Sequence, residues 1–189
     1  MGTLYDVEGF NVVHTTLDEE LENVRPEHKA KVGTSLVAAF GCYSVILEQA
    51  HIDQMASLQV NPTTMMKPGA YVIVLEDFIK TLTPQERAAI VYHEIGHLVN
   101  DHLVNVNPED VATQAKILLN TEAELEADQY AADRVGKAVM KSALEKVLTN
   151  GCDVIEEFAA KNGKPFDKGA FLAAVYAEDQ LRVRFAALS

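Results

Sequence analysis

Two different spacings of apolar residues divide the chain into a mixed N-terminal half and a helical C-terminal half. The β-branched run at residues 10–16 and the apolar run Tyr71–Leu75 predict strands. Apolar positions spaced for one helical face predict a helix over about 26–50. A short acidic turn of helix is expected at 18–22, and residues 55–60 are expected to be extended.

From residue 83 onward the apolar positions follow the period of a helix. Thr83, Pro84 and Glu86 have the spacing of a capping box with proline in the first turn, which predicts a helix reaching about Leu103. The remaining predicted helices cover a segment from after Asn107–Pro108 to about Gly136, and then 137–148, 154–160 and 168–187, with breaks at Asn–Gly pairs. The fold class predicted is therefore α+β, mostly helical, with a small sheet in the N-terminal half.

Length and charge narrow the possible functions. The 189 residues fit a single domain over 1–189 that can bury a sizeable core. A net charge of −12 argues against general nucleic-acid binding and against docking on an anionic membrane. No apolar run is long enough to insert into a membrane, and no signal peptide is visible, so a cytoplasmic protein is expected. Cys42 and Cys152 are expected to be reduced thiols that act as small hydrophobes.

The sequence His93-Glu94-Ile95-Gly96-His97 is an HExxH motif, and it lies within the capped helix predicted above. Residues four apart share a helical face, so both imidazoles can bind one ion, for which zinc suits the ligand type. Glu94 lies beside this face and can act as general base toward a water molecule at the ion. Because the string arises by chance in about 2% of such sequences, its position within a predicted helix matters.

A catalytic zinc site needs a third protein ligand, and the sequence offers two sources. His102 has the wrong spacing for a histidine ligand, and on a continuing helix it would point about 140° away from His97. Of the glutamates in a later predicted helix, Glu124 shares a face with Asp128, whereas Glu122 and Glu126 are expected on a solvated face. The Glu124 face can supply both a ligand and a carboxylate that accepts a hydrogen bond from a ligand histidine.

Three features resemble the gluzincin metallopeptidases of the HtpX and CAAX-prenyl-protease type. They are the stretch Thr83–Tyr92 leading into HEIGH, His102 five residues after His97, and the element Glu124–Asp128, which has leucine where an aromatic residue is usual. The resemblance covers about residues 70–135. A weaker resemblance, over Glu124–Ala132, is to metallopeptidases of the ImmA/IrrE kind.

The resemblance implies a zincin-like domain in which a small mixed sheet lies next to the HExxH helix. It implies one Zn²⁺ per chain bound by His93, His97 and Glu124, with Glu94 as general base and Asp128 supporting a ligand. The chain departs from HtpX-type enzymes because it has no apolar run that could form their transmembrane helices, and because Glu178 stands where a histidine is expected.

The function predicted is that of a zinc metalloendopeptidase acting on a protein or peptide substrate, with a narrow intracellular target. Tyr176 and Arg184, on the last predicted helix, are candidates to stabilise the oxyanion of the transition state. The strand Tyr71–Leu75 either pairs with an extended substrate or is simply a core strand. The alternative function is a non-proteolytic zinc-containing binding or regulatory module, against which the presence of Glu94 argues. The sequence does not indicate an oligomeric state.

Overall fold

The computed structural model describes residues 3–22, 41–57, 67–103, 120–161, 163, 165–175 and 178–189. Its strands are β1 (Thr3–Val7), β2 (Phe10–Thr15), β3 (Cys42–Leu47) and β4 (Gly69–Leu75). Its helices are α1 (Leu17–Glu22), α3 (Gln49–Ser57), α4 (Glu76–Ile79), α5 (Pro84–Val99), α7 (Thr121–Val135), α8 (Lys137–Lys161), α9 (Lys168–Val175) and α10 (Glu178–Ala187). The fold is α+β and mostly helical, as predicted.

The four strands form one mixed sheet in the order β1-β2-β4-β3. β2 and β4 run parallel, and the other two neighbouring pairs are antiparallel. The β4 residues Tyr71–Leu75 are buried, as a central strand requires. Since β4 is paired on both sides, the suggestion that its edge binds a substrate was wrong. Among the described strands, β1 and β3 are the outer ones.

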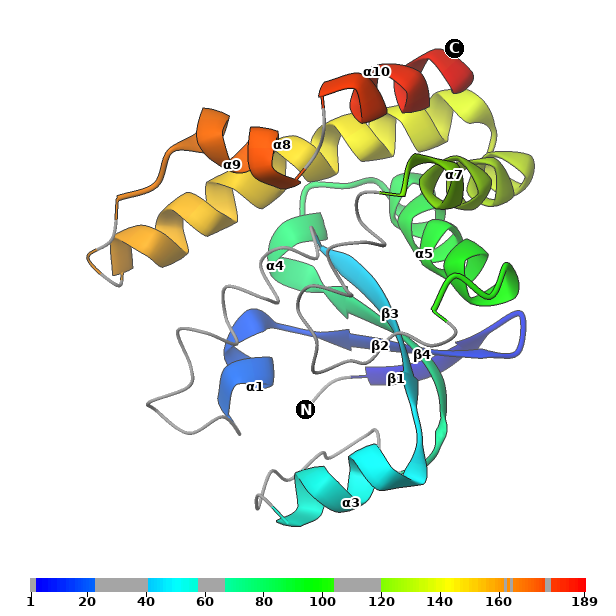
Figure 1. The fold of residues 1–189 in the computed structure, drawn as a ribbon, viewed down its shortest axis with the longest axis vertical. Coiled ribbons are helices and arrows are strands. Elements are labelled where there is room, and N and C mark those ends of the chain that lie inside the picture. Colours follow the sequence, from blue (N-terminus) through cyan, green and yellow to red (C-terminus); the bar gives the residue numbers. More distant parts are fainter. Residues whose placement is uncertain are drawn as a thin grey trace.

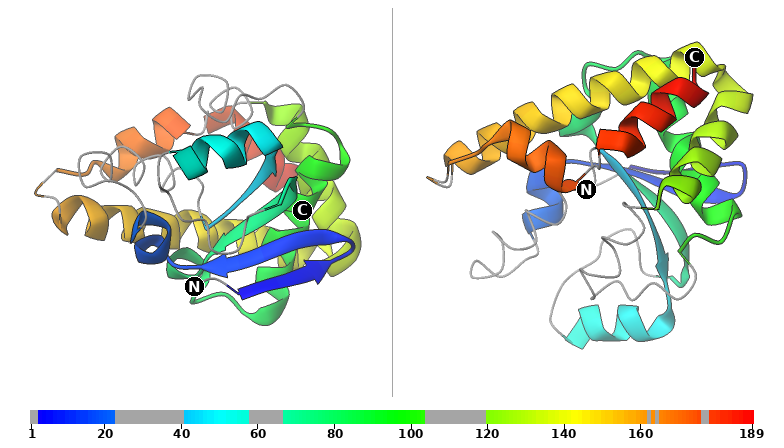
Figure 2. Two further views of the ribbon diagram at one scale, coloured as in Figure 1. Left: turned by 90° about the horizontal axis from the view of Figure 1, so that it is seen from below. Right: turned by 45° about the horizontal axis from the view of Figure 1, so that its top comes forward.

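Helices cover the sheet in successive layers (Figures 1 and 2). Helix α5 packs on β3 and β4, the long helix α8 and the shorter α7 pack on α5, and α10 packs on α7. The fully buried Ile73 of β4, Ile95 of α5 and Met140 of α8 belong to one core cluster, which extends as far as Leu188. The HExxH helix is therefore the middle layer, between the sheet and the C-terminal helices.

The start of α5 is formed by the predicted capping box. The Thr83 hydroxyl accepts a hydrogen bond from the backbone N–H of Glu86, and the Glu86 carboxylate accepts one from the backbone N–H of Thr83. Glu86 also accepts bonds from Ser142 at 2.7 Å and from Lys146 at 2.8 Å, both on α8. One buried carboxylate thus caps α5 and joins it to α8.

The helix predicted over 26–50 is wrong over 42–47, where the chain forms β3, and residues 26–40 of it lie outside the described part. Pairing with β4 outweighs a helical spacing that Tyr43, Ile46 and Leu47 satisfy only locally. Gly41 precedes the strand at φ +95°, where an added Cβ would lie 2.8 Å from Phe78. Only glycine fits this entry into β3 without strain.

Other boundaries differ from the predictions because packing extends or ends a helix. Residues 55–57 were expected to be extended but belong to α3, and 58–60 lie outside the described part. Helix α8 continues through Asn150-Gly151, because Val147, Gly151 and Ile155 prolong its buried face. Helix α5 ends at Val99, short of Leu103. The last predicted helix is described as α9 and α10, between which residues 176–177 lie outside the described part.

None of the helices in the described part of the chain is both long enough and apolar enough to cross a membrane. Cys42 and Cys152 are free and buried, in agreement with their expected role as small hydrophobes.

Candidate metal centre

Three buried side chains from two helices converge on one point. His93 and His97 lie one turn apart on α5, and their Nε2 atoms are 3.2 Å apart. Glu124, in the first turn of α7, places Oε1 3.4 Å from His97 Nε2 and Oε2 3.6 Å from His93 Nε2. One ligand atom from each residue lies within 4.8 Å of the others, so the group is able to hold a metal ion.

The donor set and its spacing fit zinc. Metal–ligand bonds of about 2.0–2.1 Å place the ligand atoms of a tetrahedral zinc site about 3.3–3.4 Å apart. The three separations of 3.2, 3.4 and 3.6 Å lie close to that value. Two imidazoles with one carboxylate leave a fourth position free, which distinguishes catalytic zinc sites from closed structural ones.

A glycine allows α7 to approach α5 closely enough for Glu124 to join the histidines. A Cβ added at Gly96 would lie 2.9 Å from the Ala127 Cα and 3.1 Å from the Tyr130 Cβ. Asn120 caps α7 by accepting a hydrogen bond from the Ala123 N–H, which places Glu124 in the first turn. The Asn120 cap and the close contact at Gly96 together fix the position of Glu124 beside the two histidines.

Asp128 lies behind His93, in the place predicted for a supporting carboxylate. Its Oδ1 is 2.9 Å from His93 Nδ1, so the carboxylate lies in close contact with the second ring nitrogen of this histidine. Burial disfavours a charged His93, yet the carboxylates of Asp128 and Glu124 outweigh this effect and raise the pKa of His93. The contact holds the imidazole with Nε2 toward Glu124.

Arg184 of α10 is fully buried behind both carboxylates. Its Nε and Nη2 donate to the two oxygens of Asp128 at 2.7 and 2.8 Å, and its Nη1 lies 2.6 Å from Glu124 Oε2. Burial alone would raise the pKa of Glu124, but the Arg184 guanidinium and the two histidines lower it to about 2. The pKa of Asp128 is likewise held well below its ordinary range by His93 and Arg184, against the effect of burial.

These contacts bear on the two residues suggested for oxyanion stabilisation. The guanidinium of Arg184 is directed at Glu124 and Asp128, and in the structure it holds these two carboxylates in place. Tyr176 lies outside the described residues.

Glu94 lies beside the ligand group, and its carboxylate accepts a hydrogen bond of 3.0 Å from the hydroxyl of Ser44 on β3. Burial raises the pKa of Glu94, with His93 and His97 acting in the opposite direction. Ser44 was not among the predicted site residues, because its segment was predicted to be a helix. A lone serine within the apolar strand CYSVIL was the available signal.

His102 does not point away from His97, as a continuing helix would require. Its Nδ1 lies 2.9 Å from His97 Nδ1, and its Nε2 lies 2.9 Å from Glu126 Oε2. Glu126 is about half exposed, as expected of the outer face of α7, but it has a specific partner. The expected direction of His102 was wrong because α5 ends before this residue.

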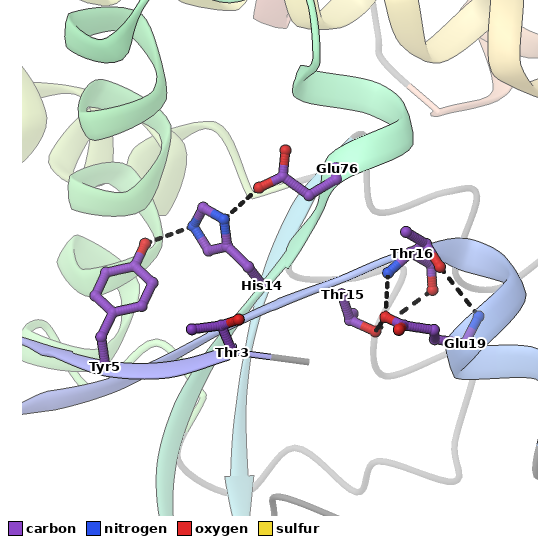
Figure 3. A pocket seen from close by; sticks show the side chains of 7 residues that line it. All are labelled: Thr3, Tyr5, His14, Thr15, Thr16, Glu19 and Glu76. Carbon is purple, nitrogen blue, oxygen red and sulfur yellow. Dashed lines mark hydrogen bonds and ion pairs between the residues drawn. The ribbon is translucent and has the colours of Figure 1, made fainter. Parts of the chain in front are cut away.

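A separate open cavity of about 380 Å³ lies between β1, β2, α1 and α4 (Figure 3). His14 is one of the residues that line it, with Nδ1 bonded to Glu76 and Nε2 to the hydroxyl of Tyr5. Nearby, Thr16 and Glu19 cap α1 reciprocally. Because these polar groups bond to one another, we assign the cavity a structural role.

A segment of the chain that contains α5 is similar to a known protein family. Residues 47–118 match the family model of peptidase family M48. The matched segment contains HEIGH but ends before Glu124, so the assignment of the third ligand rests on geometry. The family match agrees with the gluzincin-type resemblance found in the sequence. No curated protein and no solved structure matches the chain.

Proposed function

We propose that the protein is a zinc-dependent endopeptidase whose metal is held by His93, His97 and Glu124. The observation that carries the proposal is the buried convergence of these three side chains, at separations suited to tetrahedral zinc. The match of the HEIGH segment to a peptidase family supports peptide-bond hydrolysis as the reaction. Zinc, when bound, supplies Lewis acidity to a water molecule and to the scissile carbonyl.

Glu94 is the general base in this proposal. It follows His93 directly in the chain, does not belong to the ligand group, and is held by the Ser44 hydroxyl. A carboxylate in this position takes a proton from the attacking water and passes it to the leaving amine. A purely structural metal site has no use for such a base, which argues against the non-proteolytic module.

The substrate backbone is proposed to pair with β3. Among the described strands β3 is an outer one, and its Ser44 contacts the general base, so a peptide paired along the side away from β4 would lie near the reacting groups. Main-chain hydrogen bonds to an exposed strand bind an extended peptide without fixing its sequence. Pockets for side chains then decide specificity, for which we propose a narrow protein target.

The roles of the remaining site residues follow from their contacts. Asp128 orients His93, and Arg184 keeps the carboxylates of Asp128 and Glu124 ionised and in place. The core cluster includes residues from β2 to Leu188, which supports one domain over the whole chain.

The test is peptide hydrolysis by the zinc-loaded protein and by Glu94→Gln, with a random peptide library and labelled casein as probes. We expect library cleavage that falls at least about 100-fold in Glu94→Gln, while zinc content is unchanged. Equal cleavage by the two proteins would refute the role of Glu94. Absence of cleavage by the zinc-loaded wild type would favour a non-proteolytic module, and extensive digestion of casein would contradict a narrow target.

A further inference from the structure

His97 has two ring nitrogens with different neighbours. Its Nε2 faces Glu124 and His93, at 3.4 and 3.2 Å, and is the ligand atom of the metal centre proposed above. Its Nδ1 faces away from this group and lies 2.9 Å from His102 Nδ1. The rings of His97 and His102 meet edge to face, with centroids 5.1 Å apart. The second nitrogen of this ligand is therefore engaged by another imidazole.

A metal ion bound to His97 Nε2 determines which ring nitrogens of His97 and His102 carry a proton. A neutral imidazole that offers Nε2 to a metal carries its proton on Nδ1, so His97 donates to His102. His102 then accepts at Nδ1 and carries its own proton on Nε2. That proton is donated to Glu126 Oε2, 2.9 Å away. The hydrogen bonds thus run in one direction, from His97 to His102 and from His102 to Glu126, whose carboxylate reaches solvent.

The end of α5 is shaped to bring His102 back to His97. Asp101 adopts a left-handed conformation at φ +57°, just beyond the helix end. The His102 N–H then bonds to the His97 carbonyl at 3.0 Å, and the Asp101 N–H to the Leu98 carbonyl at 3.4 Å. This pair of bonds is a recognised helix-terminating pattern that usually has glycine at the left-handed position. A non-glycine residue there costs about 1 kcal/mol, so the turn is maintained by other contacts.

Helix α7 supplies a supporting carboxylate to each ligand histidine. Asp128 contacts His93 directly and is buried, whereas Glu126 reaches His97 only through His102 and is 53% exposed. Both follow Glu124, the third ligand candidate, on the same helix, Glu126 by two residues and Asp128 by four. Carboxylates that receive the second ring N–H of a ligand histidine orient the ring and strengthen its donation to the metal.

We infer that His102 and Glu126 are positioning residues of the metal centre, which fix the tautomer and orientation of His97 through a His97–His102–Glu126 hydrogen-bond chain. The inference rests on the proposed function, since it assumes that His97 binds a metal ion. It predicts that removing the acceptor at position 102 weakens zinc binding although no ligand is changed.

The experiment measures the zinc dissociation constant of the full-length protein by competition with a chromophoric chelator. His102→Leu and His102→Asn are matched in size, but only asparagine retains an oxygen near the position of Nδ1. We expect His102→Leu to bind zinc 10–100-fold more weakly and His102→Asn to recover most of the loss. Glu126→Ala should weaken binding several-fold, while Glu122→Ala, which removes an exposed charge from the same helix, should not change it.

Thermal unfolding of each metal-free variant shows whether it folds. Because Glu126→Ala changes an exposed side chain, this variant tests the hydrogen-bond chain even if no substitution at position 102 folds. Wild-type zinc affinity in a folded His102→Leu and in Glu126→Ala would overturn the inference and leave the proposed function intact. Equal weakening by leucine and asparagine would also overturn it, since packing alone would then explain the effect. Failure of the wild type to bind zinc would overturn both.

Discussion

Gly96 of α5 lies so close to Ala127 of α7 that a Cβ at position 96 would be 2.9 Å from the Ala127 Cα. Ala127 stands between Glu124 and Asp128 in the sequence, so this contact sets how near both carboxylates come to the histidines. Backbone approach at one small residue thus determines the dimensions of the metal centre.

Gly96→Ala should therefore be destabilising, although alanine is the better helix former by about 1 kcal/mol. We expect a net loss of about 1–3 kcal/mol in the free energy of unfolding, because backbone atoms of α7 cannot give way as a flexible side chain would. Zinc binding should weaken as Glu124 moves away from the histidines. Urea denaturation and zinc titration measure the two effects.

Gly69→Ala is the matched control, since a Cβ there meets only ordinary contacts at 3.7 Å. A Gly96→Ala protein as stable as the wild type, with full zinc affinity, would show that α7 does not need this close approach.

Removal of the buried guanidinium should destabilise the metal-free protein strongly. Arg184→Gln leaves Asp128 and Glu124 without the cation that both contact, which costs about 3–5 kcal/mol for a buried pair broken on one side. Arg182→Gln is the control on the same helix, because its pair with Asp179 is exposed and contributes about 0–1 kcal/mol. Equal stability of the two variants in chemical denaturation would refute the role given to Arg184.

Glu86 should make stability depend on pH in acid. Burial alone would raise its pKa, but Lys146, Ser142 and the Thr83 cap lower the pKa of Glu86 from 4.5 to about 2. A carboxyl whose pKa is lower in the folded state stabilises the fold above the unfolded value, and this contribution is lost as pH falls toward the folded value. The free energy of unfolding of Glu86→Gln should thus be lower by about 2 kcal/mol at pH 6.

The deficit of Glu86→Gln should shrink between pH 4.5 and about 2, which urea titrations at several pH values would measure. Glu145→Gln, on the exposed side of α8, should show no such trend. A deficit that stayed constant down to pH 2 would mean that the charge of Glu86 does not contribute.

Ser44→Ala tests whether the strand β3 positions the general base. Loss of the hydroxyl that bonds Glu94 should lower kcat about tenfold, as expected for one hydrogen bond to a charged group. Zinc content and stability should stay near wild-type values, because the hydrogen bond of Ser44 goes to Glu94, which is not one of the ligand candidates. Steady-state kinetics and metal analysis measure these effects, and an unchanged kcat would show that Ser44 does not position Glu94.

The parts of the site that share one helix could be predicted from sequence. HExxH on a capped helix gives the relation of His93 to His97, because four residues make about one turn. The same rule places Glu124 and Asp128 on one buried face of α7. It cannot describe what happens where a helix ends, so the left-handed turn at Asp101 reversed the expected direction of His102.

The errors in the fold have a similar origin. The spacing of Tyr43, Ile46 and Leu47 suits a helix, and only the long-range pairing with β4 makes this segment a strand. Asn150-Gly151 is a local stop signal that the buried stripe of α8 overrides. The contact of Arg184 with Asp128, 56 positions away in the chain, depends on the docking of α10 against α7, which no local pattern reveals.

The most direct test of the metal centre is the zinc content of the purified protein after exhaustive dialysis, compared with that of Glu124→Ala and Glu122→Ala. Glu124 is buried at the ligand group, whereas Glu122 is exposed on the same helix, so the two variants lose the same charge in different places. We predict about one zinc per chain in the wild type and in Glu122→Ala, and almost none in Glu124→Ala. A wild type that takes up no zinc at neutral pH, or a Glu124→Ala protein that retains it fully, would contradict the assignment of His93, His97 and Glu124 as the metal centre.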